Sequence, residues 1–289
     1  MSRTAAPVPS SASSPPPGRR RSPAVAGLFY PAQPGALLET VRSLLAEAAS
    51  MAGPAVAALA PHAGYVYSGR TAAHVFARLE VPPRVIVVAP NHTGDGEAAH
   101  GGSVYALGGF LTPLGEVPVD EDLAALALAE CPLLEDDPAA HRREHAVEVE
   151  LPFLLARRPD VRVVPIVLAW SDWPSCRRLG EALAAVARRA GERVLLLAST
   201  DLNHYESAAA GGPKDRAVLA ECARLDGEAL LEVTRKRRVS MCGRAAAAAV
   251  LHAARLLGAT AGDIVHYSHS GMVTGDDDSV VGYGGVIVR

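Results

Sequence analysis

The sequence predicts a single-domain α/β sandwich with a mainly parallel or mixed central sheet covered by helices. Short apolar runs alternate with longer segments of helical periodicity from residue 23 to residue 289. The short runs are apolar on both faces and several are rich in valine, which is typical of strands buried between helix layers. No linker-like break interrupts this pattern, so one domain is expected over residues 23–289.

Each expected element follows from its own pattern. The strands are bounded by Pro, Gly or Ser, and they comprise residues 55–60, 84–89, 161–168, 193–198 and 283–288. Wider spacing of apolar residues indicates helices at 35–50, 68–79, 121–130, 148–157, 174–190, 213–225 and 243–257. Because every strand after the first follows one or two helices, the order favours a sheet with parallel pairs.

Residues 1–22 differ from the rest of the chain. They are mostly Ser, Pro, Ala and Arg with almost no large apolar side chains, a composition that predicts a disordered tail. Three arginines at 19–21 suggest an export signal, but the apolar stretch after them ends at Pro31 and is too short for one. The other apolar runs fall far below the roughly 20 residues of a membrane-spanning helix.

The charge balance argues against two classes of partner, and the cysteines indicate a location. With 28 Lys and Arg against 31 Asp and Glu, the net charge of −3 gives no broad footprint for nucleic acid or for a membrane surface. The four cysteines are scattered without a CxxC pair, which argues against a disulfide framework. A reducing cytoplasm is therefore the expected location.

Three of the expected strands are each followed by a histidine. His62 follows residues 55–60, His92 follows 84–89, and His204 follows 193–198 with Asp201 three positions before it. Ligands of open α/β sheets bind outside the carboxyl ends of the strands. One such histidine alone would be a capping or hydrogen-bonding residue, but three at one edge predict a metal or acid–base site.

Cys242 adds a fourth candidate directly ahead of the expected helix 243–257. The positive end of a helix dipole lowers the pKa of a thiol there and favours the thiolate, a ligand for borderline or soft metals. The alternative is a small buried hydrophobe, and this interpretation is preferred for Cys131, Cys176 and Cys222.

A competing pattern is His141, Glu144 and His145, which match the H-x-x-E-H motif of zinc peptidases. The acidic run 276–278 and the basic cluster 235–238 are interpreted as a solvated turn and a solvated helix end. The sequence contains no glycine-rich phosphate loop and no G-x-S-x-G elbow, so nucleotide cofactors and serine-hydrolase chemistry are not supported.

Several ordered motifs together resemble one family. They are Ala-Gly-Leu-Phe-Tyr-Pro at 26–31, Pro-His-Ala-Gly-Tyr at 61–65, Ser-Gly at 68–69, Pro-Asn-His at 90–92, Glu-His at 144–145 with Glu148, Leu-Pro-Phe at 151–153, Ser-Thr-Asp at 199–201, His-Tyr at 204–205 and Cys-Gly at 242–243. The chain from residue 23 to residue 289 thereby resembles the Memo family, whose bacterial and archaeal members are called AmmeMemoRadiSam system protein B.

The resemblance implies a fold and a site. Memo proteins resemble class III extradiol dioxygenases, non-haem iron enzymes that open catechol-type rings at one edge of an α/β sheet. By that resemblance the metal ligands would be His62, His92 and Cys242, the catalytic pair would be His204 and Asp201, and the pocket would include Phe29, Tyr65, Asn91 and His145. A cysteine stands where the dioxygenases have a carboxylate, and a soft thiolate moves metal preference from Fe(II) toward copper. The expected cofactor is therefore one iron or copper ion, in preference to zinc.

These observations lead to one expected function and two alternatives. The first is a metal-dependent oxidoreductase acting on a small molecule, in which His204 moves protons and is oriented by or paired with Asp201. The second is a binding or scaffold protein that uses the same pocket for a peptide, since eukaryotic Memo proteins are associated with receptor-driven cell motility. The family name also implies two companion partners, the system's protein A and a radical SAM protein. The third is a zinc hydrolase built on His141, Glu144 and His145.

Overall fold

The computed structural model describes residues 19–98 and 101–289. Its main sheet contains β2 (Ala57–Ala60), β3 (Arg84–Pro90), β4 (Gly102–Val104), β7 (Leu134–Asp136), β8 (Arg162–Leu168), β9 (Val194–Ser199), β10 (His204–Glu206), β11 (Gly262–His269) and β12 (Val280–Val288). The strand order is β10-β12-β2-β9-β3-β8-β4-β7, and β11 pairs with β12. The pairs among β2, β9, β3 and β8 are parallel, whereas β12 is antiparallel to its neighbours. The predicted α/β fold with a mixed sheet is confirmed.

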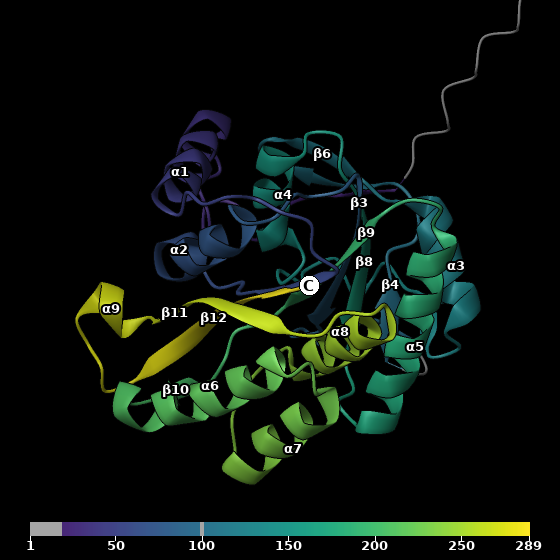
Figure 1. Cartoon of the computed structure of the whole chain (residues 1–289). Coiled ribbons are helices and arrows are strands. Elements are labelled where there is room, and N and C mark those ends of the chain that lie inside the picture. Colours follow the sequence, from purple (N-terminus) through teal and green to yellow (C-terminus); the bar gives the residue numbers. More distant parts are fainter. Residues whose placement is uncertain (1–18, 99–100) are drawn as a thin grey trace, which may run out of the picture.

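Helices cover both faces of this sheet (Figure 1). One group is α1 (Pro34–Glu47), α2 (Tyr65–Phe76) and α4 (Leu151–Arg157), which follows the 3₁₀ turn η1 (Glu148–Glu150). The other is α5 (Trp173–Arg189), α6 (Ala208–Ala223), α7 (Gly227–Arg237) and α8 (Arg244–Leu256), with α3 (Glu121–Glu130) beside α5. The short α9 (Gly271–Thr274) follows β11 at the edge of the sheet. No helix within the described ranges combines the length and apolar character needed to cross a membrane.

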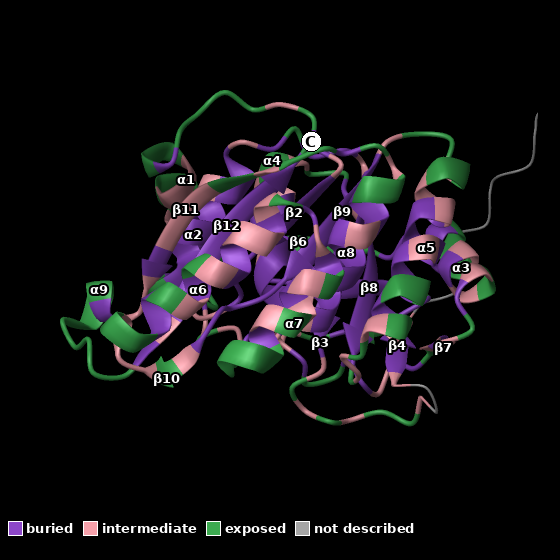
Figure 2. Cartoon of the chain, turned by 60° about the horizontal axis from the view of Figure 1, so that its bottom comes forward, coloured by how far each residue is buried: buried purple, intermediate pink, exposed green. Residues whose placement is uncertain are grey.

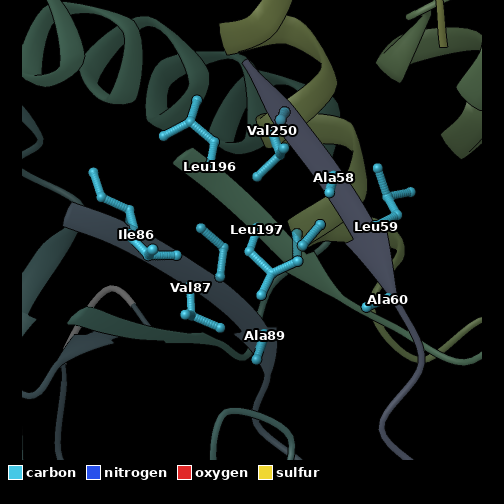
Figure 3. Close-up of a cluster of buried hydrophobic side chains, with 14 of the residues drawn as sticks. Ala58, Leu59, Ala60, Ile86, Val87, Ala89, Leu196, Leu197 and Val250 are labelled. Atoms are coloured by element: carbon cyan, nitrogen blue, oxygen red, sulfur yellow. The ribbon is translucent and has the colours of Figure 1, made fainter. Parts of the chain in front are cut away.

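One part of the core lies between the central strands and α8. The central strands are buried along their length, and exposed residues lie mainly in the loops and on the outward faces of the helices (Figure 2). Val250 of α8 lies against Leu196 of β9 and Ala58 of β2 (Figure 3). Residues 245–249 of α8 are five consecutive buried alanines. Such small side chains let the helix approach the sheet closely, which fixes where its first turn meets the strand ends.

Strand register brings the ends of three parallel strands to one edge. Ala60 of β2 pairs with Ser199 of β9, and Val88 of β3 pairs with Ala198 of β9. The segments that follow β2, β9 and β3 therefore leave the sheet side by side. This edge is the place where an open α/β sheet binds its ligands.

The described chain begins with a strand that composition did not predict. Arg20–Arg21 forms β1, which pairs in parallel with β5 (Gly109–Thr112), and β6 (Gly115–Pro118) completes this three-stranded sheet. Arg21 is buried and forms an ion pair with the buried Glu148. The prediction of disorder up to residue 22 was therefore wrong for residues 19–22, because a paired charge holds this segment in the fold. Residues 1–18 of the expected tail lie outside the described residues.

Candidate metal centre

Three donor side chains from separate segments meet at this edge. His62 follows β2, His92 follows β3, and Cys242 precedes α8. One ligand atom from each lies within 4.8 Å of the others. His62 Nε2 lies 3.4 Å from Cys242 Sγ, and the two imidazole rings are nearly perpendicular with centroids 5.1 Å apart. Two imidazoles and one thiol thus come together at this edge of the sheet.

His62 is fixed on two sides. Its Nδ1 lies 2.8 Å from Ser199 Oγ, and its backbone N–H donates a 3.0 Å hydrogen bond to Asp201 Oδ1. Burial lowers the pKa of His62 well below its ordinary value, and the charges of the neighbouring histidines lower it further. The ring is therefore neutral at pH 7, and its Nε2 faces Cys242.

His92 is held by Glu144, to which the sequence analysis gave a chemical role only in the competing hydrolase motif. Glu144 Oε1 lies 2.9 Å from His92 Nδ1, and the two carboxylate oxygens also accept the backbone N–H groups of His92, His145 and Ala146. Burial alone would raise the pKa of Glu144, but the hydrogen bond from His92 and the backbone donors lower it to about 2. An ionised carboxylate only accepts, so Nδ1 of His92 carries the proton and Nε2 is left for a ligand.

Cys242 is a neutral thiol in the metal-free chain. Its Sγ accepts the backbone N–H of Asp201 at 3.2 Å. Burial raises the pKa of Cys242 to about 12, and the neighbouring Asp201 charge adds to this. The expected lowering by the end of α8 is therefore wrong for this state, because burial of the sulfur outweighs the helix dipole. A bound metal ion would take the place of the thiol proton.

Asp201 and His204 also lie beside Cys242. These three residues also offer ligand atoms within 4.8 Å of one another. Burial raises the pKa of Asp201 to about 7, and burial lowers the pKa of His204. Within the described part of the chain no hydrogen bond joins Asp201 to His204; the Asp201 carboxylate accepts from the His62 backbone, and His204 Nδ1 is buried without a partner.

A cavity of about 810 Å³ opens onto the donor atoms. Its wall carries Phe29, whose ring packs edge-on against His145 at 4.8 Å, and His145 stacks on His92 at 4.7 Å. The cavity also has lining residues to which the sequence analysis gave no role in the site. Leu28, Ala63, Gly64 and Tyr205 belong to motifs that the chain shares with the Memo family. The fold alone adds the others, which are Val66, Tyr67, Ser240, Ser270, Thr274, Val281 and Tyr283.

Two predicted pocket residues lie outside this cavity. Tyr65 is buried at the start of α2, and its hydroxyl donates to the backbone oxygen of Val149 at 2.7 Å. Asn91 closes its own turn, because its Oδ1 accepts from the backbone N–H groups of Thr93 and Gly94. Both side chains therefore support the backbone around the site.

The arrangement does not support the zinc-hydrolase alternative. His141 is buried, its Nε2 lies 3.1 Å from the backbone oxygen of Ser103, and its ring packs against Tyr105 and Phe110. Among the described residues, Glu144 and His145 share a group of ligand atoms with His92 and not with His141. The segment forms turns where the motif needs a continuous helix, so its two histidines face different surroundings.

Fold and site together define a mixed α/β protein with a two-histidine, one-cysteine donor set at the carboxyl edge of its sheet. The model of the family described as "Memo-like protein" matches residues 21–287, and the chain belongs to this family. A MEMO1 family protein of Methanopyrus kandleri is 37% identical over 282 residues, which cover 93% of this chain and 99% of that protein. A MEMO1 family protein of Aquifex aeolicus is 38% identical over 271 residues, which cover 93% of this chain and 99% of that protein. The solved structure of an uncharacterized protein from Escherichia coli K12 matches with a TM-score of 0.49 and 17% identity, covering 79% of this chain and 98% of the other.

Proposed function

We propose that this protein is an oxidoreductase that depends on one iron or copper ion held by His62, His92 and Cys242. The observation that carries the proposal is the convergence of three donor atoms from separate segments within 4.8 Å. The Nδ1 atoms of both imidazoles are engaged by Ser199 and Glu144, so each ring has its Nε2 left for a ligand. Outer partners of this kind orient the histidines of metal sites.

The donor set fits the proposed metals. Two imidazoles with one thiolate suit copper, because a soft sulfur replaces the hard carboxylate of Fe(II) oxygenases. Such a donor set also binds iron. When bound, such an ion would supply the one-electron and oxygen chemistry that side chains lack. The chain's own residues would position the substrate in the cavity and handle protons.

His204 is the residue we assign to proton transfer. Its ring borders the cavity and Cys242, and its buried Nδ1 has no partner among the described residues. Burial keeps the pKa of His204 below its ordinary value, so the ring is neutral at pH 7 and can accept a proton from a bound substrate. Asp201 holds the backbone of His62 and lines the same cavity.

A second candidate function, recognition of a peptide or protein partner, is favoured by the mouth of the cavity. Leu28, Val66 and Tyr205 line it and are 81%, 68% and 78% exposed. Met272 and Val273 of the adjacent α9 are exposed as well. Exposed apolar side chains gathered around a cavity mark interaction sites. The companion proteins implied by the family name, the system's protein A and a radical SAM protein, are the partners we propose to test.

Metal analysis of protein purified without a His-tag tests the first function. We expect close to one iron or copper ion per chain in the wild type and at least a tenfold loss in His62→Ala and Cys242→Ser. Cys176→Ser is the matched control, because this buried cysteine lies in α5 outside every described group of ligand atoms, and its metal content should be unchanged. Equal and negligible metal in all four proteins would refute the proposal.

The partner function has its own test. A Leu28→Ser, Tyr205→Ser double variant keeps the ligands and changes only the mouth of the cavity. We expect it to retain metal but to bind the two purified companion proteins more weakly than the wild type. Unchanged binding by the double variant would argue against partner recognition at this surface.

A further inference from the structure

Two fully buried glutamates lie two residues apart on η1 and have opposite surroundings. Glu148 forms an ion pair with Arg21 and accepts hydrogen bonds from Tyr30 and from two backbone N–H groups. Among the described residues, Glu150 has no ion pair with a basic side chain, and its Oε2 has no hydrogen-bond partner. Its other oxygen is contacted by Ser199, whose Oγ lies 2.8 Å from Oε1. The surroundings of Glu148 stabilise an ionised carboxylate, and the surroundings of Glu150 do not.

The contacts of Ser199 Oγ decide where the protons lie. Three atoms surround it, each at 2.8 Å: Nδ1 of His62, the backbone oxygen of Ala146, and Oε1 of Glu150. Each contact at this distance requires one proton between the two atoms. A serine hydroxyl supplies one proton and accepts two. The backbone oxygen of Ala146 only accepts, so it takes the serine proton, and the two remaining neighbours must both donate.

We propose that Glu150 is a positioning residue of the metal centre that acts as a neutral acid. Its Oε1–H donates to Ser199 Oγ, Ser199 accepts the Nδ1–H of His62, and the lone pair of His62 Nε2 is thereby directed at the metal position. This inference rests on the proposed metal function of His62. It assigns to a buried carboxyl, which contacts neither metal nor substrate, the task of holding a ligand in one tautomer.

The electrostatics of the segment agree with this geometry. Burial has the largest effect and raises the pKa of Glu150 well above its ordinary value; the hydrogen bond with Ser199 lowers the pKa, and the charge of Asp201 raises it. An ionised Glu150 would accept the hydrogen bond from the Ser199 hydroxyl. The backbone oxygen of Ala146 would then face a lone pair of Ser199 Oγ at 2.8 Å. The neutral acid avoids both an unpaired buried charge and an unsatisfied buried carbonyl.

Infrared spectroscopy of metal-free protein at pH 7 tests the protonation directly. In the difference spectrum between wild type and Glu150→Gln, we expect the loss of the C=O stretch of a protonated carboxyl group. Glu47→Gln, at the exposed end of α1, is the matched control and should remove the bands of an ionised carboxylate. Loss of ionised carboxylate bands in Glu150→Gln would overturn the proposal.

Two further measurements test the positioning role. Histidine ¹⁵N spectra of the metal-free protein should show the His62 proton on Nδ1 in wild type and in Glu150→Gln, and a mixture of tautomers in Ser199→Ala. In anaerobic titrations with Fe²⁺, Glu150→Gln should stay within about twofold of wild type because its amide still donates. Ser199→Ala and Glu150→Leu should bind about 10–100-fold more weakly, the usual cost of losing an outer-layer partner.

The outcomes separate this inference from the proposed function. A wild-type His62 protonated on Nε2, or a Glu150→Gln as weak as Ser199→Ala, overturns the positioning role. A wild type that binds no metal overturns the proposed function, and the infrared and ¹⁵N spectra still decide the state of Glu150.

Discussion

Acidification is expected to destabilise this protein through His141. Burial lowers the pKa of His141 to about 4, against 6.5 for a free histidine. Between these values the unfolded chain binds a proton that the folded chain excludes. The folded state therefore has its full stability above pH 6.5, loses stability as the pH falls from 6.5 to 4, and loses no more below pH 4 through this group. At about 1.4 kcal/mol for each pKa unit, His141 contributes about 3 kcal/mol to the pH dependence of the free energy of unfolding. About 2 kcal/mol of this is lost between pH 7 and 4.5.

Urea unfolding of wild type and His141→Gln at both pH values measures this contribution. Glutamine is uncharged throughout, and its amide can donate to the backbone oxygen of Ser103 as His141 Nε2 does. Carboxylates elsewhere titrate in both proteins and cancel in the comparison. We expect the wild type to lose about 2 kcal/mol more than the variant between pH 7 and 4.5. Equal losses would show that His141 is protonated in the folded state and would refute the reasoning.

Three other predictions concern the surroundings of the site. Glu148→Ala leaves the Arg21 charge buried without its partner, so urea unfolding should show a free energy of unfolding lower by about 3–5 kcal/mol. A decrease below about 1 kcal/mol would mean that water reaches the ion pair. Glu144→Gln removes the charged acceptor of His92, so Fe²⁺ affinity should fall about 10–100-fold with an unchanged circular dichroism spectrum; unchanged affinity would contradict the orienting role. Gly243→Ala places a methyl group 2.5 Å from a backbone oxygen of β9, so thermal unfolding should show a free energy of unfolding lower by about 1–3 kcal/mol. An unchanged Tm would show that the start of α8 shifts freely.

The central strands and the long helices could be predicted because their signals are local. A strand buried on both faces is a continuous apolar run whatever its neighbours are, as in Arg84–Pro90 and Arg162–Leu168. The three-residue strands β4, β7 and β10 carry no such signal, since partners distant in the sequence define them. Likewise α6 begins at Ala208, five residues before its predicted start, because Ser207 caps it and Pro213 is accommodated inside it.

The donor residues of the site were predictable for a related reason. Parallel strands end at one edge, so histidines placed directly after them come together without detailed knowledge of packing. The direction of a side chain is not encoded in this way. Tyr65 and Asn91 adjoin the same strand ends, yet both turn to backbone groups. The roles of Glu144 and Glu150 were missed because each depends on a contact about 50 residues distant, with the segment after β3 and with β9 respectively.

These contacts make one short segment responsible for both imidazoles of the candidate centre. Glu144 holds His92 directly, and Glu150 reaches the other imidazole through a serine. The guanidinium of Arg21 braces the same segment at two points, the backbone oxygen of Glu144 and the carboxylate of Glu148. If β1 detached, the buried carboxylate of Glu148 would lose the partner of its ion pair. The stability of β1 and that of the segment 144–150 therefore depend on each other. The first described residues, which composition assigned to a disordered tail, are therefore structurally coupled to the orientation of the proposed metal ligands.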